Sequence, residues 1–290
     1  MGKFFDTLRK SEKSISSLAG APVFREVVKI PSSDIDELRV APSPEKHVVS
    51  PPPRSIAGTD PRLVRVHDPT SPAAESFRIL CSKLLLSGRD ESRRLLLVTS
   101  AQPEDGKTLV AANLAVSIAL GTNFDVVLVD CDLRRPSLHN TFGCQARSGL
   151  REYLEAGHSL GPYLINTPIE RLTLLPGGKP RETGSDLLNP AKVRLLVDQI
   201  KNHYRDPVVI FDTPPIRFFA DGAHLCSVAD GVLLVVRCGR TSRALIQEAL
   251  ASVGREKILG VVFNASDEGR RDYKHYYHYY RRQREPASEV

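Results

Sequence analysis

The sequence contains no long hydrophobic run. Its longest apolar stretch extends from Leu109 to Leu120, about half of the ~20 residues that a membrane-spanning helix needs. Two polar residues, Asn113 and Ser117, interrupt even this stretch. The first residues also lack the apolar segment that follows the charges of a secretory signal. We therefore expect neither a membrane span nor an export signal, and we expect the chain to be cytoplasmic.

Cysteine pairs and clustered charge are also missing. The cysteines include no C-x-x-C pair, so we expect reduced thiols that pack as small hydrophobic side chains. The net charge is +6, but residues 1–70 carry +2 of it and residues 270–290 carry +3. The residues between are almost neutral, whereas a nucleic-acid-binding surface needs clustered Lys and Arg, so we expect no nucleic-acid partner. The five cysteines are Cys81, Cys131, Cys144, Cys226 and Cys238.

Prolines are concentrated near the N-terminus. Nine of the 21 lie within residues 1–70. Proline lacks a backbone N–H and fixes φ, so this stretch cannot form long helices or central strands. We predict a mostly disordered arm over residues 1–70, a folded domain over residues 71–267 and a flexible tail over residues 268–290.

Short apolar strands alternate with helical patterns through the middle of the chain. A helix is predicted to begin at Ser71-Pro72, where a capping residue precedes proline. The strand candidates are continuous runs of Val, Leu and Ile, as in strands buried on both faces. This order predicts an α/β fold, a parallel sheet covered by helices on both faces. The predicted strands are 94–99, 126–130, 172–175, 208–212, 232–236 and 258–263, and the later helices are 107–120, 149–156, 191–204, 222–227 and 242–255.

A phosphate-binding loop follows the first predicted strand. Residues 101–108 match the pattern G-x-x-x-x-G-K-[ST], except that alanine replaces the first glycine. Gly106 lets the backbone approach phosphates, Lys107 would bridge the β- and γ-phosphates, and Thr108 would place a hydroxyl on Mg²⁺. Carboxylates repel phosphates, so the acidic pair in the loop is expected to face solvent or a partner's basic groups. The expected nucleotide-binding residues are Ala101, Gln102, Pro103, Glu104, Asp105, Gly106, Lys107, Thr108 and Leu109.

Carboxylates end two of the predicted strands. Asp130 and Asp132 follow the second strand, and Asp212 ends a later one. The carboxyl ends of parallel strands meet at one edge of an open sheet, where ligands bind. An apolar strand that ends in Asp is typical of a site that holds nucleotide-bound Mg²⁺. We therefore expect these carboxylates to converge with Lys107 and Thr108.

Together these segments resemble the three motifs of the bacterial tyrosine kinases, P-loop autokinases of polysaccharide export loci. The similarity covers about Ser71 to Asn264. The segment Met1–Lys13 resembles the start of standalone autokinases from exopolysaccharide loci tied to cell-surface protein sorting. The motif residues are the loop 100–108, Asp130-x-Asp132-x-Arg134-Arg135-Pro136 with His139, and Phe211-Asp212-Thr213-Pro214-Pro215.

The resemblance implies a P-loop NTPase fold, ATP and Mg²⁺ as cofactors, and roles for individual residues. Asp130 is expected to accept or orient the tyrosine proton. The loop departs from the family at Glu104, where glycine is common. The helix 72–85 departs at Cys81, where the family's E-x-x-R-x-x-R pattern for ring assembly has a second Arg, which predicts a weaker oligomer. The expected catalytic residues are Lys107, Asp130, Asp132 and Arg134, and the expected metal ligands are Thr108, Asp132 and Asp212.

Five of the eight tyrosines lie in a short basic stretch of the tail. Aromatic and basic residues together are also typical of single-stranded nucleic-acid binding, or of a helical packing patch. The kinase resemblance favours an autophosphorylation cluster, in which each phosphate adds about −1.5 to −2 charges. The expected phosphorylation sites are Tyr273, Tyr276, Tyr277, Tyr279 and Tyr280.

The family also implies partners. These are an inner-membrane chain-length or co-polymerase protein that activates the kinase, further copies of this chain in a homo-oligomer, and a cognate tyrosine phosphatase. The chain would then be peripheral at the inner membrane through its partner.

Two other functions fit part of the pattern. A partitioning-type P-loop ATPase typically carries an extra lysine early in the loop, but Gln102 stands there. A nucleotide-bound, non-catalytic scaffold for polysaccharide export would share every nucleotide-binding residue. The tyrosine-rich tail favours the kinase over both.

Overall fold

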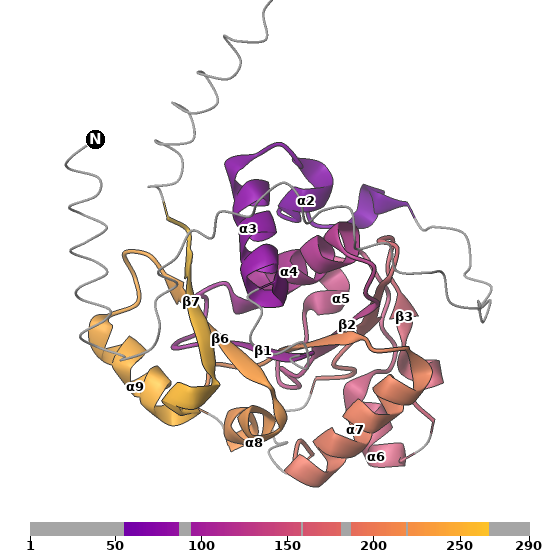
Figure 1. Cartoon of the computed structure of the whole chain (residues 1–290). Helices are drawn as coiled ribbons and strands as arrows, with labels where there is room; N and C mark the ends of the chain where they lie inside the picture. The colour runs from indigo at the N-terminus through magenta and orange to yellow at the C-terminus, as the bar shows by residue number, and fades with distance from the viewer. Residues whose placement is uncertain (1–54, 87–93, 158, 181–186, 219, 267–290) are drawn as a thin grey trace, which may run out of the picture.

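A seven-stranded sheet forms the centre of the protein, in the order β3-β4-β2-β5-β1-β6-β7 (Figure 1). The computed structural model describes residues 55–86, 94–157, 159–180, 187–218 and 220–266. Neighbouring strands pair in parallel except β3 and β4, which are antiparallel. The strands are β1 Leu95–Ser100, β2 Val126–Asp130, β3 Ile165–Asn166, β4 Leu172–Leu175, β5 Val208–Asp212, β6 Gly231–Arg237 and β7 Ile258–Asn264.

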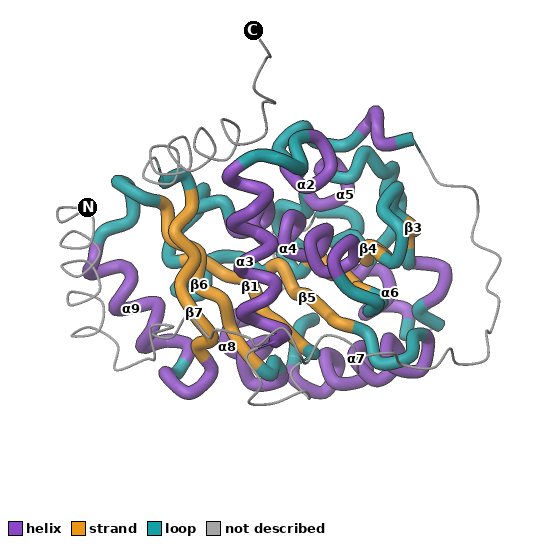
Figure 2. Tube along the Cα trace, turned by 45° about the horizontal axis from the view of Figure 1, so that its top comes forward, coloured by secondary structure: helices purple, strands orange, loops and turns teal. Residues whose placement is uncertain are grey.

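Helices cover both faces of this sheet. In two views, α3 and α4 lie on one face and α7, α8 and α9 on the other (Figures 1 and 2). Alternate residues of β1 face the two layers, with Leu96 and Val98 in one hydrophobic cluster and Leu95 and Leu97 in the other. The helices are α2 Val64–His67, α3 Pro72–Leu86, α4 Lys107–Gly121, α5 Leu138–Thr141, α6 Leu150–Ala156, α7 Pro190–His203, α8 Ala220–Val228 and α9 Arg243–Val253, with single 3₁₀ turns at Ile56–Gly58, Gly161–Tyr163 and Arg255–Lys257.

The predicted fold class is confirmed, and the predicted strands and helices match the observed ones within two residues at each end. Strand β3 was not predicted. It contains two residues on the outer side of the short strand β4, and two residues are too few to show any hydrophobic period.

Helix α4 is buried around its whole circumference. Every residue from Val110 to Ala119 is buried, including the polar Asn113 and Ser117. One side of α4 packs on the sheet, and α2 and α3 cover the outer side. A helix with neighbours on all sides needs no polar face, which explains the apolar stretch in the sequence.

The prediction of a disordered arm is wrong for residues 55–70, which pack on the folded domain. Leu63 is completely buried. The backbone N–H of Asp60 donates to the carbonyl of Thr141 over 2.9 Å, and the N–H of Val64 donates to Oδ1 of Asn113, also over 2.9 Å. Proline does prevent long elements here, since only one-turn helices form. Side-chain burial and hydrogen bonds to α4 and α5 order the segment instead. Residues 1–54 lie outside the described part of the chain.

The described surface agrees with the composition. All five cysteines are free thiols, and four of them are buried, as predicted.

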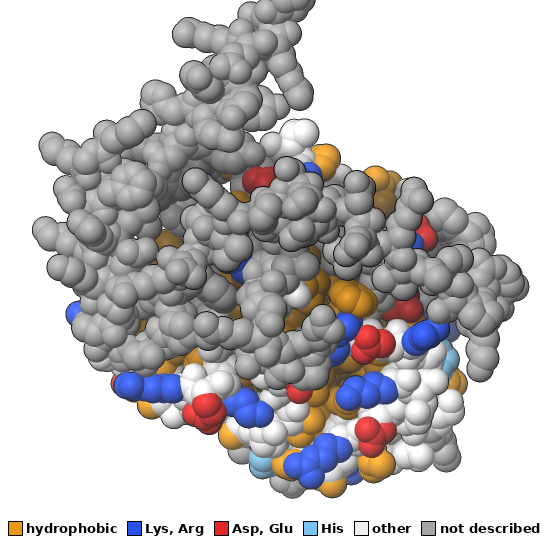
Figure 3. Space-filling model, in the orientation of Figure 1, with side chains coloured by type: hydrophobic (Ala, Val, Ile, Leu, Met, Phe, Trp, Pro, Cys, Tyr) orange, Lys and Arg blue, Asp and Glu red, His pale blue; other side chains and the backbone are white. Residues whose placement is uncertain are grey.

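Lys and Arg alternate with Asp and Glu on the visible lower part of the face in Figure 3. Within the described ranges, every helix is too short or too polar to span a bilayer.

We expect Leu63→Ala to destabilise the folded domain by ~2–5 kcal/mol, because it leaves a cavity beneath residues 55–70. The matched control is Leu120→Ala, at a position that is 50% exposed on the same layer, which should cost less than ~1 kcal/mol. Urea unfolding of the full chain measures both. Equal, small effects would show that residues 55–70 are not part of the cooperative unit.

Candidate active site

The phosphate loop leaves the buried strand β1 and enters α4 at Gly106. Gly106 adopts a left-handed conformation with φ of 92°, which is strained for other residues. A Cβ at this position would also collide with the side-chain amide of Asn264, at the end of β7. The backbone conformation and the close approach of the Asn264 side chain therefore both favour glycine here.

Asp105 fastens the loop from inside. The expectation that it faces solvent or a partner is wrong, because Asp105 has no exposed surface. Its carboxylate accepts hydrogen bonds from the Thr241 hydroxyl at 2.8 Å and from the Gln102 N–H at 3.3 Å, and its carbonyl accepts one from Asn264 at 2.8 Å. Local donors thus satisfy this carboxylate, which explains why it can lie under a phosphate-binding loop.

Glu104 does face solvent, as predicted. Its carboxylate pairs with Arg240 of the same chain at 2.8 Å, and its carbonyl accepts a hydrogen bond from Arg237 at 3.1 Å. The backbone of Glu104 has a positive φ of 64°, a region that glycine enters more easily. This conformation accounts for the glycine that is common at this position in the resembling family.

Lys107 and two of the predicted carboxylates come together beside the loop. Lys107 Nζ lies 3.4 Å from Oδ2 of Asp132, and both side chains are 14% exposed. Asp212 is buried, and neither of its carboxylate oxygens has a hydrogen-bond partner of good geometry within the described residues. Burial raises the pKa of Asp212 to about 6, while the charge of Lys107 and the hydroxyl of Thr108 limit the rise.

Asp130 is held differently. It lies opposite Asp212 in the register of β2 and β5 and has no exposed surface. Its Oδ2 accepts backbone N–H groups of Ser137 at 2.8 Å and Leu138 at 3.0 Å, whereas Oδ1 accepts a single N–H from Asp132 at 3.2 Å. Burial and the neighbouring Asp212 charge raise the pKa of Asp130 to about 8, against the lowering effect of these N–H groups. Asp130 therefore fixes the turn after β2, with one oxygen less fully engaged.

The oxygen atoms around Asp212 fit Mg²⁺, a hard cation that prefers carboxylate, hydroxyl and phosphate oxygens. An unpartnered, buried carboxylate beside a hydroxyl is a favourable position for such a cation. Across the described ranges, no three His, Cys, Asp or Glu side chains are arranged to hold a metal ion by themselves. The site thus suits a cation that a bound phosphate also coordinates.

An open pocket of about 640 Å³ lies over the loop. Arg237 and Asn264, at the ends of β6 and β7, line one end, and the turn after β2 lines the other. Of the expected nucleotide-binding residues, Glu104, Gly106, Lys107, Thr108 and Leu109 line this pocket, whereas Ala101 and Asp105 are buried below it, Gln102 contacts Asp105, and Pro103 is exposed.

Two groups of predicted residues lie away from the pocket or outside the described chain. Arg134 is half-buried in the turn after β2 and is not a lining residue. All five tail tyrosines fall within residues 268–290, which the structure does not describe.

Fold and site define a nucleotide-binding protein of the P-loop class. Residues 96–289, more than half of the chain, match the family CbiA, the CobQ/CobB/MinD/ParA nucleotide binding domain. Two relatives and a solved structure then specify the branch of this class.

Tyrosine-protein kinase CpsD of Streptococcus agalactiae is 30% identical over 213 residues, which cover 72% of this chain and 91% of CpsD. The succinoglycan biosynthesis transport protein ExoP of Rhizobium meliloti is 30% identical over 231 residues, 73% of this chain but 28% of ExoP. The kinase domain of Escherichia coli tyrosine kinase ETK matches with a TM-score of 0.64 and 26% identity, over 76% of this chain and 87% of that domain. The chain belongs to the bacterial tyrosine-protein kinases, which confirms the resemblance.

Sequence reasoning missed the residues that fasten the loop from the far side of β1. Asn264 ends an apolar strand, as Asp130 and Asp212 do, and this shared position could have indicated it. Arg237 at the end of β6 and Thr241 in the turn after it contact the loop, and no pattern in the sequence marks them.

We expect Asp212→Asn to stabilise the protein at high pH when Mg²⁺ and nucleotide are absent. The folded-state pKa of Asp212, about 6, exceeds the ordinary 3.8, so the fold loses stability as the pH rises through this interval. The variant should therefore exceed wild type by up to ~3 kcal/mol at pH 8 and by little at pH 4.

Urea titrations at both pH values measure this difference. Mg²⁺ and ADP added together at pH 8 should stabilise wild type more than Asp212→Asn. Parallel pH profiles of the two proteins would contradict the assignment.

Proposed function

We propose that the chain is an ATP-dependent protein-tyrosine autokinase that phosphorylates the tyrosine cluster of its own tail. The observation that carries this proposal is the buried Asp212 carboxylate, which has no hydrogen bond of good geometry in the described chain and lies beside Lys107 and Thr108 at the start of α4. In a chain of the tyrosine-kinase family, that arrangement suits Mg-ATP. The five tail tyrosines supply acceptors on the same chain.

In the proposed reaction, the tyrosyl oxygen bonds to the γ-phosphorus while the bond from that phosphorus to the β–γ bridging oxygen breaks. ADP leaves with the electron pair, and the tyrosyl proton passes to a carboxylate. Lys107 neutralises β- and γ-phosphate charge, and the backbone N–H groups at the start of α4 hold the phosphates. Thr108 and Asp212 would hold Mg²⁺, which withdraws charge from the phosphates, and Asp132 would support both the cation and Lys107.

Asp130 is our candidate for the proton. Its pKa of about 8 is close to neutral pH, as effective general bases require. Oδ1, which accepts a single N–H at 3.2 Å, is the oxygen able to receive it. Because Asp130 has no exposed surface, the acceptor tyrosine must displace part of the turn that follows β2.

Polysaccharide export is the proposed process. ExoP is named for succinoglycan transport, and this chain matches 28% of it. We infer that the remaining functions of such a system come from a separate inner-membrane co-polymerase, which raises the basal activity of this kinase and places it at the membrane. A cognate tyrosine phosphatase would reset the tail.

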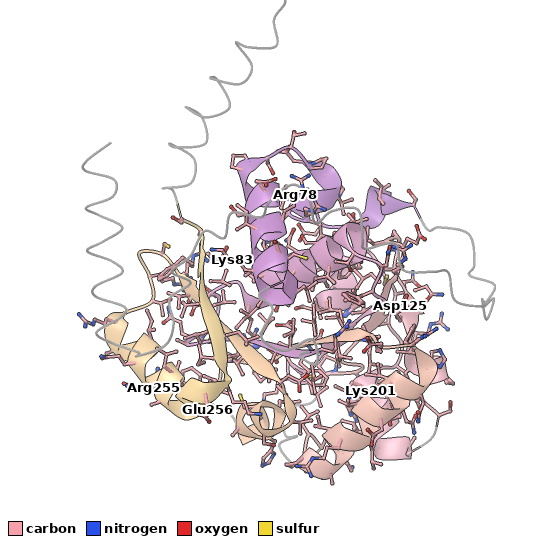
Figure 4. All side chains as sticks on the ribbon, in the orientation of Figure 1. Arg78, Lys83, Asp125, Lys201, Arg255 and Glu256 are labelled. Carbon is pink, nitrogen blue, oxygen red and sulfur yellow. The ribbon has the colours of Figure 1, made fainter. Side chains whose placement is uncertain are left out.

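Self-association is also proposed, through α3. Glu75 and Arg78 form an ion pair at 2.6 Å on this helix, and Arg78 also donates to the carbonyl of Pro69 at 2.7 Å. Cys81 is buried against α4, so the third position of the assembly pattern faces the core. The exposed part of the pattern is therefore shorter than in the family, which supports a weaker oligomer. Figure 4 shows Arg78 and Lys83 along α3.

Lys107→Met should abolish phosphotyrosine formation while leaving the fold intact, because the residue lies on the pocket surface. Incubation of the full chain with Mg-ATP, followed by phosphotyrosine detection, measures it. A labelled wild type would also exclude a partitioning ATPase and a non-catalytic scaffold. Labelling of Lys107→Met at the wild-type rate would refute the loop assignment.

Asp130→Asn and Asp132→Asn should separate the two carboxylates. We expect Asp130→Asn to retain Mg-ATP affinity within about five-fold and to lose ~10²-fold or more in transfer rate. Asp132→Asn should weaken Mg-ATP binding, since it contacts Lys107 at 3.4 Å. The opposite result would exchange their roles, and normal transfer by Asp130→Asn would leave it a structural residue.

A further inference from the structure

The pocket over the phosphate loop continues beyond the three motifs. On the side of β2 it is lined by Asp60 and Arg62, from the segment that precedes α3, and by Asn140 and Thr141 of α5. No motif of the sequence includes Asp60 or Arg62. The pocket is therefore lined by the cationic side chain of Arg62 in addition to that of Lys107.

The backbone at Arg62 is fixed relative to the phosphate loop. The side chain of Asn113, buried inside α4, donates to the carbonyls of Arg62 and Leu109, both at 3.0 Å, and accepts the N–H of Val64 at 2.9 Å. Lys107 is the first residue of the same helix. One rigid element therefore sets the separation of Lys107 and Arg62.

The side chain of Arg62, by contrast, is 70% exposed. Among the described residues, its guanidinium is hydrogen-bonded to Asp60 alone. Nη2 of Arg62 lies 2.7 Å from Oδ2 of Asp60, and Nε lies 3.0 Å from Oδ1. This hydrogen bonding lowers the pKa of Asp60, so the pair is ionised at neutral pH. Exposed ion pairs are weak, and a guanidinium fork fits phosphate oxygens as well as carboxylate oxygens. Arg62 can therefore exchange Asp60 for a phosphoryl group.

The position of the carboxylates identifies which end of the pocket this is. Asp212 ends β5, and Asp132 follows β2. Both strands lie on one side of β1, the side on which the turn after β2 and Arg62 line the pocket. Arg237 and Asn264 lie on the other side of β1. The γ-phosphate of a bound nucleotide would lie near the carboxylates that hold its cation. The nucleoside would then occupy the end of the pocket near Arg237, and the acceptor tyrosine would enter near Arg62.

We propose that Arg62 is a catalytic residue that binds the phosphoryl group during its transfer to tyrosine. Its guanidinium leaves Asp60 and contacts the equatorial oxygens of the phosphoryl group as the tyrosyl oxygen bonds to phosphorus and ADP departs. It then pairs with the phosphotyrosine product. Lys107 is partly neutralised by Asp132, so Arg62 supplies the additional positive charge that the transferring group requires. This inference rests on the proposed kinase function.

Arg62→Gln, Arg62→Lys and Arg255→Gln in the full chain test the proposal. Arg255 is exposed in the 3₁₀ turn that follows α9, away from α2, and its substitution removes the same charge (Figure 4). We expect Arg62→Gln to lower the rate of phosphotyrosine formation ~10²-fold while the affinity for a fluorescent ADP analogue stays within about three-fold. Arg62→Lys should restore part of the rate, since it keeps the charge and loses the fork. Arg255→Gln should match wild type.

If wild type and Arg255→Gln form phosphotyrosine and Arg62→Gln does so equally fast, Arg62 has no catalytic role and the kinase function stands. If wild type forms none with Mg-ATP, the proposed function fails, and this inference fails with it. Should Arg62→Gln melt at a lower temperature than wild type, Arg62→Met provides the second variant. It keeps the apolar part of the side chain and removes the charge, so its rate should be as low as that of Arg62→Gln at a temperature at which it is folded, and a wild-type rate would overturn the proposal.

Discussion

Two carboxyl groups lie side by side in the centre of this protein, and neither reaches bulk water. Asp130 and Asp212 are opposite residues on adjacent parallel strands, and both have a raised pKa because burial disfavours the charged form. Different groups offset the cost of burying each carboxylate. Backbone N–H groups satisfy Asp130, whereas Asp212 has the positive charge of Lys107 nearby and no hydrogen bond of good geometry in the described chain. Beside the phosphate loop, the sheet therefore places one carboxylate that is hydrogen-bonded among the described residues and one that is not. The second, Asp212, would be stabilised by a bound cation.

The loop itself is held from two directions, which explains its precise shape. On the side of β2, Lys107 contacts Asp132. On the side of β6 and β7, Thr241 and Asn264 hold Asp105. Hydrogen bonds of this kind fix the loop before any phosphate arrives, so binding does not have to order it. Preorganisation reduces the entropy lost when a ligand binds.

The sequence predicted those features that repeat or that obey local rules. Buried parallel strands are continuous apolar runs, and G-K-T after such a strand is a local pattern, so the sheet and Lys107 were found without the structure. The packing of residues 55–70 was not predicted, because no local sequence pattern indicates that Leu63 is buried against α4. Asn113 illustrates the same limit. In the sequence it is only an interruption of an apolar stretch, and its partners, Arg62 and Val64, are about 50 positions away. The exposure of Asp105 was mispredicted because its partner Thr241 lies 136 positions away in the chain.

The hydrogen bonds of Asn113 also determine where the autonomous folding unit begins. The motifs start the kinase domain near residue 71, but a fragment cut there would lose the Arg62 carbonyl and the Val64 N–H and would expose the surface that Leu63 covers. The buried amide oxygen of Asn113 would then lack a donor, which costs ~1–3 kcal/mol in addition to the lost apolar contact. Proteolysis between residues 55 and 71 would therefore weaken the support of the phosphate helix as well as remove a surface segment. Cleavage there would therefore lower the activity of the enzyme, although the cut lies outside the phosphate loop and both carboxylate motifs.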